Sequence, residues 1–193
     1  MTRRRARLLL ALLLLAGALS GGVLWQREQA RRAAARATLE RIAALRQSDA
    51  PPVRRVADAD ALFAATLPLS DGGLLRLSTL RGRPVVVNFW ASWCPPCIAE
   101  MPGLSRFAAA HPQLAVIGIA IDHDNAVRAF LKLHPVRYPV LLGGQVGYDL
   151  LGELGDVRHD LPYTVVIGVD ASVRAQHLGR IEPAALQRLL DRT

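Results

Sequence analysis

The feature that most constrains this chain is a Cys-Pro-Pro-Cys tetrapeptide at residues 94–97, which holds both cysteines of the 193-residue sequence. It follows the run VVVNFW (85–90), whose continuous apolar and β-branched character predicts a strand buried on both faces. The residues after the first cysteine read as a helix over 95–110. The two prolines are tolerated there because the first helical turn has no intrahelical use for their N–H groups. The cysteines are therefore expected where a central strand passes into a helix.

That position favours redox chemistry at the thiols. The positive end of a helix and its free N–H groups stabilise a thiolate, which is the nucleophile in disulfide exchange. Cys94 is therefore the predicted nucleophile, and Cys97, one turn deeper, is the predicted resolving cysteine that attacks the mixed disulfide. A structural zinc site normally needs four ligands, and a purely structural disulfide around so small a loop would remove little chain entropy. We predict a redox-active Cys94–Cys97 disulfide that works without a bound cofactor or metal.

The remaining segments alternate between strand and helix patterns. A short hairpin is expected over 72–84, entered through Asp71-Gly72-Gly73. Asp124 has the position of a helix cap. The further predicted strands cover 114–121, 138–142, 163–169 and 173–179, and the further predicted helices cover 126–134, 146–154 and 182–192. This order, with a hairpin near its end, predicts a three-layer α/β domain.

The net charge of +8 is concentrated ahead of the predicted domain. Residues 1–65 contain 12 basic and 5 acidic side chains, whereas residues 66–193 contain 12 basic and 11 acidic ones. A nucleic-acid-binding protein carries its positive charge on the folded module. The distribution therefore argues against nucleic-acid binding.

The amino-terminal segments predict export. Residues 1–7 form a basic region, and the uncharged run 8–25 would span about 27 Å as a helix, close to the thickness of a bilayer core. We predict an uncleaved transmembrane anchor with the basic region in the cytoplasm; the alternative is a signal peptide cleaved near Ala16-Gly17-Ala18. Residues 26–65 are expected to form an Ala/Arg-rich helical stalk and linker, followed by the domain at 66–193.

With these residues in view, the sequence resembles the membrane-anchored, TlpA-type thioredoxin-like proteins of bacteria, whose relatives include the ResA-type and CcmG-type reductases. The resemblance covers about residues 66–191. Its motifs are LRGRPVVVNFWASWCPPCIAEMP, YPVLLGG, LPYTVVIGVDASV and HLGRI. It implies a thioredoxin-like α/β/α fold with an N-terminal β-hairpin extension and a central βα insertion.

The resemblance also implies the substrate-binding residues. It identifies Pro162 as a proline that faces the disulfide in a cis peptide bond. The backbone of Leu161 would then hydrogen-bond an extended partner segment, and Trp93 would join both residues in contacting substrate. From the sequence alone, Pro162 would also be tolerated in a trans bond as the residue ahead of a buried strand.

A proton-transfer group is expected near the second cysteine. Cytosolic thioredoxins carry a buried aspartate six residues before the first cysteine, where this chain has Asn88, and an amide cannot take up a thiol proton. Glu100 lies one helical turn after Cys97 and matches a glutamate of the ResA-type proteins. We predict proton transfer by Glu100; the alternative is an ordinary surface glutamate.

Together these features predict an exported thiol–disulfide oxidoreductase that reduces disulfides of exported proteins, as in cytochrome c maturation or periplasmic redox homeostasis. The expected location is the bacterial inner membrane with the C-terminal domain in the periplasm. The expected electron donor is a membrane thiol reductase of the DsbD or CcdA type. Two alternatives stay open: a thiol peroxidase of the peroxiredoxin type, and a non-enzymatic copper-binding module of the Sco type, although Sco proteins use a CxxxC spacing.

Overall fold

The computed structural model describes residues 26, 29–31, 33 and 58–191. The few described residues before position 34 are helical and exposed. The predicted basic region (1–7) and anchor (8–25) lie outside the described residues. Within the described part of the chain, no helix combines the length and the apolar character that crossing a membrane requires.

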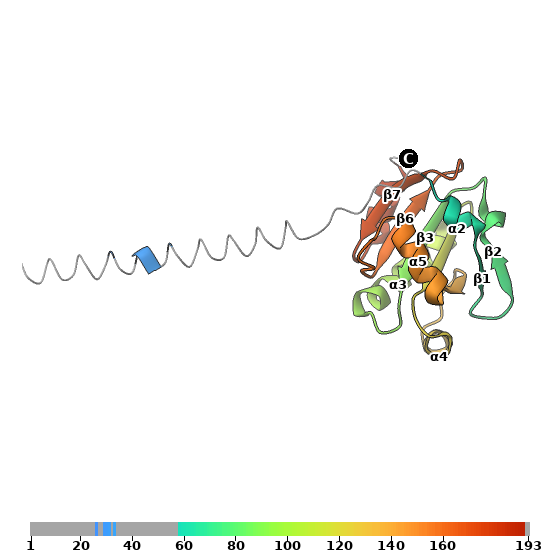
Figure 1. The fold of residues 1–193 in the computed structure, drawn as a ribbon, viewed down its shortest axis with the longest axis horizontal. Coiled ribbons are helices and arrows are strands. Elements are labelled where there is room, and N and C mark those ends of the chain that lie inside the picture. The colour runs from blue at the N-terminus through green and yellow to red at the C-terminus, as the bar shows by residue number, and fades with distance from the viewer. Residues whose placement is uncertain (1–25, 27–28, 32, 34–57, 192–193) are drawn as a thin grey trace, which may run out of the picture. The chain divides into compact units, whose positions relative to one another are not determined.

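A five-stranded sheet forms the centre of the domain, in the order β5-β4-β3-β6-β7 (Figure 1). Its strands are β3 (Val85–Trp90), β4 (Ala115–Ala120), β5 (Val140–Leu142), β6 (Tyr163–Ile167) and β7 (Val173–Leu178). β3 pairs in parallel with β4 and antiparallel with β6. Every residue of β3 is buried, as the apolar run predicted. The central strand therefore ends with its last residues deep in the protein, just ahead of the cysteines.

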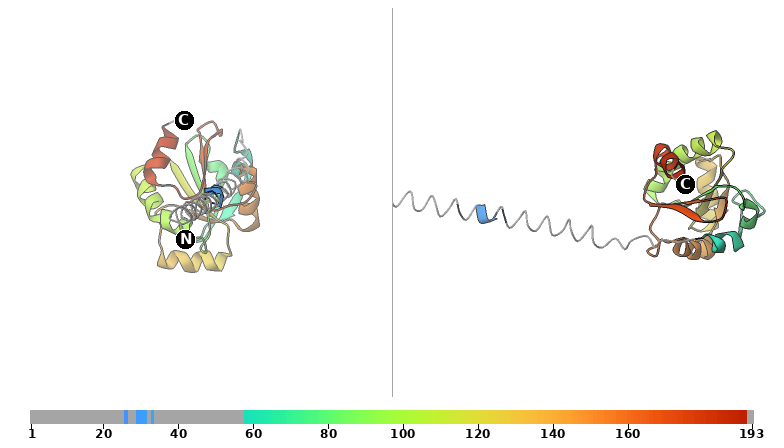
Figure 2. Two further views of the ribbon diagram at one scale, coloured as in Figure 1. Left: turned by 90° about the vertical axis from the view of Figure 1, so that its left-hand side faces the viewer. Right: turned by 90° about the horizontal axis from the view of Figure 1, so that it is seen from above.

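Helices cover both faces of this sheet. They are α2 (Asp60–Ala64), α3 (Pro95–Ala110), α4 (Asp124–Leu133), α5 (Gly144–Glu153) and α6 (Pro183–Leu190). The right-hand view of Figure 2 shows α3 and α6 on one side of the sheet and α2 and α5 on the other. Each side of the sheet has its own apolar core, and the core on the side of α3 and α6 contains both cysteines. The predicted three-layer α/β fold is confirmed.

Three details differ from the sequence-based expectations. The domain starts before residue 66, because Ala59, Leu62 and Phe63 belong to the core beneath α2 and α5. The hairpin consists of β1 (Thr66–Pro68) and β2 (Leu74–Arg76), so it begins earlier than expected and is followed by a 3₁₀ turn, η1 (Leu77–Leu80).

The third difference concerns the start of α4. His123, not Asp124, is the N-cap residue of this helix, and its side chain makes no capping hydrogen bond. Asp124 lies within the first turn, where its negative charge still favours the helix N-terminus. The cap prediction was therefore wrong by one residue.

Candidate active site

Cys94 and Cys97 form a disulfide where β3 passes into α3, as the strand and helix patterns predicted. Cys94 is the N-cap residue of α3, and its Sγ accepts a hydrogen bond of 3.3 Å from the backbone N–H of Cys97. Cys94 is 4% exposed and Cys97 is 0% exposed. In the oxidised protein, surface access to the disulfide is thus slight and lies on the side of Cys94.

The loop between β3 and Cys94 is hydrogen-bonded to Asp122, which follows the end of the neighbouring strand β4. The backbone N–H and the hydroxyl of Ser92 both donate to one carboxylate oxygen of Asp122. This contact leaves the adjacent Trp93 at the surface, with 66% of the residue exposed. A large exposed aromatic residue beside a nearly buried disulfide is suited to contact a partner protein.

The Leu161–Pro162 peptide bond is cis, as the resemblance implied. Leu161 packs against both apolar cores, and Pro162 is buried. The carbonyl oxygen of Pro162 accepts a hydrogen bond from the N–H of Gly179. The backbone of Leu161 makes no hydrogen bond with any residue in the described part of the chain. The described fold therefore does not use the N–H and C=O groups of Leu161.

Glu100 is buried, with 3% of the residue exposed, so the surface-glutamate alternative was wrong. Both of its carboxylate oxygens accept hydrogen bonds of 2.8 Å, one from the side-chain amide of Asn88 and one from the backbone N–H of Ile181. Burial raises the pKa of Glu100 to about 7, and these two N–H donors oppose that rise. A carboxyl with this pKa exchanges protons readily near neutral pH.

The structural role of Asn88 was not predicted from the sequence. Its amide nitrogen also donates to the hydroxyl of Thr164, at 3.1 Å, and the two residues face each other across β3 and β6. The signal was a polar residue in the middle of a strand expected to be buried on both faces, since a buried amide needs hydrogen-bond partners. Asn88 cannot replace the missing acid, but it positions the acid that is present.

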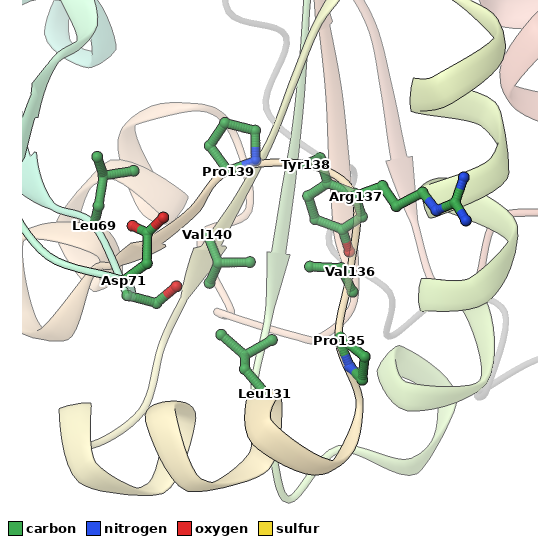
Figure 3. Close-up of a pocket in the computed structure, with 10 residues that line it drawn as sticks. Leu69, Asp71, Leu131, Pro135, Val136, Arg137, Tyr138, Pro139 and Val140 are labelled. Atoms are coloured by element: carbon green, nitrogen blue, oxygen red, sulfur yellow. The ribbon is translucent and has the colours of Figure 1, made fainter.

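One pocket of the domain lies away from the cysteines. A pocket of about 500 Å³ lies between the β1–β2 turn and the segment that leads into β5; Arg137 in this segment points away from Asp71 (Figure 3). Among the described residues that line this pocket there is no cysteine, so it is separate from the disulfide. The part of the chain that the structure describes contains no cluster of three metal-ligating side chains.

Comparison with known proteins agrees with this geometry. The AhpC/TSA family matches residues 59–176, which include both cysteines, Glu100 and Pro162. The chain belongs to this family. Within it, the chain is 30% identical over 125 residues to "Thiol-disulfide oxidoreductase ResA" of Bacillus thuringiensis, a match that covers 63% of this chain and 70% of that protein. It is 26% identical over 123 residues to "Thioredoxin-like protein YneN" of Bacillus subtilis, covering 60% and 68% of the two chains.

Solved structures of similar proteins share the fold. The structure of "MTB dsbF in its mixed oxidized and reduced forms" has a TM-score of 0.60 and 26% sequence identity, and the match covers 69% of this chain and 98% of that chain. Together with the relatives, it identifies this AhpC/TSA-family chain as a thiol–disulfide oxidoreductase with a thioredoxin-like fold. The peroxidase and copper-binding alternatives are not favoured.

Proposed function

We propose that the chain is an exported reductase of protein disulfides, with Cys94 as nucleophile, Cys97 as resolving cysteine and Glu100 as proton-transfer group. The observation that carries the direction of electron flow is that, among the described residues, only the Cys97 N–H donates a hydrogen bond to Cys94 Sγ. Pro95 and Pro96, the residues between the cysteines, offer neither an N–H group nor a charge. Cys94 therefore has modest stabilisation as a thiolate, which lowers the reduction potential of the pair.

The exchange proceeds in two balanced steps. The Cys94 thiolate attacks one sulfur of a substrate disulfide; that S–S bond breaks, a mixed disulfide forms, and the other substrate sulfur leaves and takes up a proton. Cys97 gives its proton to the Glu100 carboxylate and attacks the sulfur of Cys94. The second substrate sulfur leaves as a thiolate and is protonated. The substrate gains two electrons and two protons, and the Cys94–Cys97 disulfide returns.

The remaining parts of the proposal concern location and partners. The uncharged run 8–25 after a basic region supports an inner-membrane anchor with the domain in the periplasm. The two electrons would come from a membrane thiol reductase of the DsbD or CcdA type. Clients would be exported proteins with disulfides, in cytochrome c maturation or in periplasmic redox homeostasis.

The direction is tested by equilibrating the protein with glutathione buffers. Thioredoxin lies near about −270 mV and DsbA near about −120 mV, and we expect this protein below about −180 mV. The change Pro96→His, which adds an N–H group and a positive charge, should raise the potential. A DsbA-like value for the parent would contradict the reductase proposal.

The clients are tested by trapping. A Cys97→Ser variant forms the mixed disulfide but has no resolving thiol, so captured proteins should accumulate on Cys94. Mass spectrometry then identifies them, and a Cys94→Ser variant is the matched control. Equal capture by both variants would contradict the assignment of Cys94 as nucleophile.

A further inference from the structure

A groove of about 530 Å³ lies beside the first cysteine, between Trp93 and the N-terminal half of α5. Trp93 and Tyr148 line it, together with Ile121, and 66% of Trp93 and 42% of Tyr148 are exposed. Its volume falls in the range of roughly 300–1,000 Å³ that binding clefts occupy. Trp93, which directly precedes Cys94 in the chain, places one wall of the groove next to the cysteine that a substrate disulfide must approach.

The side chain of His159 supports the ring of Tyr148. The ring of His159 stacks on the ring of Tyr148, with centroids 3.8 Å apart and planes inclined by 4°. The imidazole also packs against α5 at Gly152, one turn after Tyr148, where an added Cβ would lie 3.0 Å from the His159 ring nitrogen Nε2. The Tyr148 ring therefore has one face covered and a fixed orientation before any partner arrives, which lowers the entropy cost of binding to it.

The same loop connects this support to the cis peptide. His159 adopts a left-handed backbone conformation, with a φ of 59°, which is uncommon outside glycine. Two residues later the chain reaches Leu161, whose backbone makes no hydrogen bond within the described part of the chain. One short loop thus carries both the ring that supports Tyr148 and the backbone groups that the described fold does not use.

We propose that this groove binds an aromatic side chain of the substrate polypeptide, located within two residues of the cysteine that Cys94 attacks. The inference rests on the proposed function, because it concerns the substrate of the same disulfide. An extended segment advances about 3.3 Å per residue and repeats its side-chain direction every two residues, so a side chain two residues from the attacked cysteine lies about 7 Å along the segment on the same face. Flat aromatic walls favour an aromatic guest. The carboxylate of Asp122, which also lines the groove, disfavours an acidic one.

The test uses the reduced full chain and a pair of disulfide peptides that differ only two residues from the attacked cysteine, with Phe in one and Gly in the other. The readout is the second-order rate constant of exchange in stopped flow, with oxidised glutathione as a substrate that has no side chain to fill the groove. The variants are Tyr148→Ala, Tyr148→Phe and, as a matched control, Leu133→Ala, which removes an exposed apolar side chain from α4.

We expect the parent to react about 3- to 10-fold faster with the Phe peptide than with the Gly peptide, the range typical of one aromatic contact. Tyr148→Ala should abolish this preference, whereas Tyr148→Phe and Leu133→Ala should keep it. Gly152→Ala, which displaces the supporting imidazole, should weaken it. The matched control Leu133→Ala should also reduce oxidised glutathione at the parental rate, because Leu133 does not line the groove.

Two results would overturn the inference: a parent without preference for the Phe peptide, or a preference that survives in Tyr148→Ala. Neither would affect the proposed reductase function. That function would fail separately if the reduced parent exchanged with neither the peptides nor oxidised glutathione.

Discussion

Two buried carboxyl groups can be compared: Glu100 lies on α3 and Asp156 in the loop after α5, and these two helices cover opposite faces of the sheet. Each is 3% exposed, and burial raises the pKa of both. The oxygens of Glu100 accept hydrogen bonds from residues 12 and 81 positions away in the sequence. The Asp156 carboxylate accepts one from the backbone N–H of Arg158, two residues away. Glu100 is thus held by the tertiary fold one turn after the resolving cysteine, whereas Asp156 organises its own loop.

This difference separates a group suited to chemistry from a group suited to structure. Burial alone raises the pKa of a carboxyl group, so a raised pKa does not by itself identify a catalytic acid. What distinguishes Glu100 is that its two fixed oxygens lie on the helix that carries Cys97. The following predictions test the contrast in order of decreasing expected effect.

The largest expected effect is a pH dependence of folding stability that comes from Glu100. Its pKa rises from 4.5 to about 7 on folding, so the folded protein binds this proton more tightly than the unfolded chain does. The stabilisation is complete below about pH 4.5 and is lost as the pH rises through about 7. Since one pKa unit corresponds to about 1.4 kcal/mol, this rise in the pKa of Glu100 corresponds to about 3 kcal/mol of unfolding free energy.

Urea denaturation of the oxidised protein between pH 4.5 and pH 8.5 measures this loss. The variant Glu100→Gln should lose most of the pH dependence, because it has no proton to release in that range. A parent and a variant with parallel stability profiles would show that Glu100 has an ordinary pKa in the folded protein.

The second prediction concerns the rate of exchange. Glu100→Gln should slow disulfide exchange about 10- to 100-fold near neutral pH, the low end of general acid–base effects. Asp156→Asn should change the rate less than about twofold, because Asp156 contacts neither cysteine. Stopped-flow reduction of a disulfide substrate across pH 5 to 9 provides the comparison. Equal slowing in the two variants would remove the distinction drawn between the two carboxyl groups.

The third prediction tests the support behind Glu100. Thr164→Val keeps the shape of a buried side chain and removes the oxygen that accepts from Asn88. A buried donor left without its acceptor costs about 1–3 kcal/mol of unfolding free energy. Asn88 still donates to Glu100, so the exchange rate should fall by less than about threefold. A rate as low as that of Glu100→Gln would instead place Thr164 in the proton-transfer path.

The sequence predicted the parts of this site that local patterns determine. The buried strand, the helix over 95–110 and the position of the cysteines between them followed from apolar character and proline placement, and the structure confirms them. Glu100 was found because it lies one helical turn from Cys97. Each of these predictions depended on residues close together in the chain.

The parts that the sequence did not predict depend on distant residues meeting. Asn88 and Thr164 lie 76 positions apart, and their contact follows from the register between β3 and β6, which neither strand determines alone. The stack of His159 on Tyr148 likewise requires the course of the loop after α5. The start of the domain was predicted too late in the chain, at residue 66, for the same reason. The short helix α2 is recognisable mainly by the distant core residues that it packs against.

The smallest expected effect belongs to the carboxyl group of Asp156. Asp156→Asn keeps an oxygen that accepts the hydrogen bond from the Arg158 N–H and removes only the charge. Because burial raises the pKa of Asp156, the ionised form is disfavoured in the folded protein, and its removal should stabilise the protein slightly at pH 8 and not at all at low pH.

Asp156→Ala separates the charge from the hydrogen bond. It removes the acceptor as well and, relative to Asp156→Asn, should cost about 1 kcal/mol at any pH, the usual value of one hydrogen bond. The loop that contains Asp156 continues into Leu161, so Asp156→Ala should also raise the KM for a peptide disulfide while kcat stays near the parental value. Thermal unfolding and steady-state kinetics of the two variants measure both effects. A fall in kcat with unchanged KM would mean that Asp156 acts on the chemical step, and the contrast with Glu100 would then no longer hold.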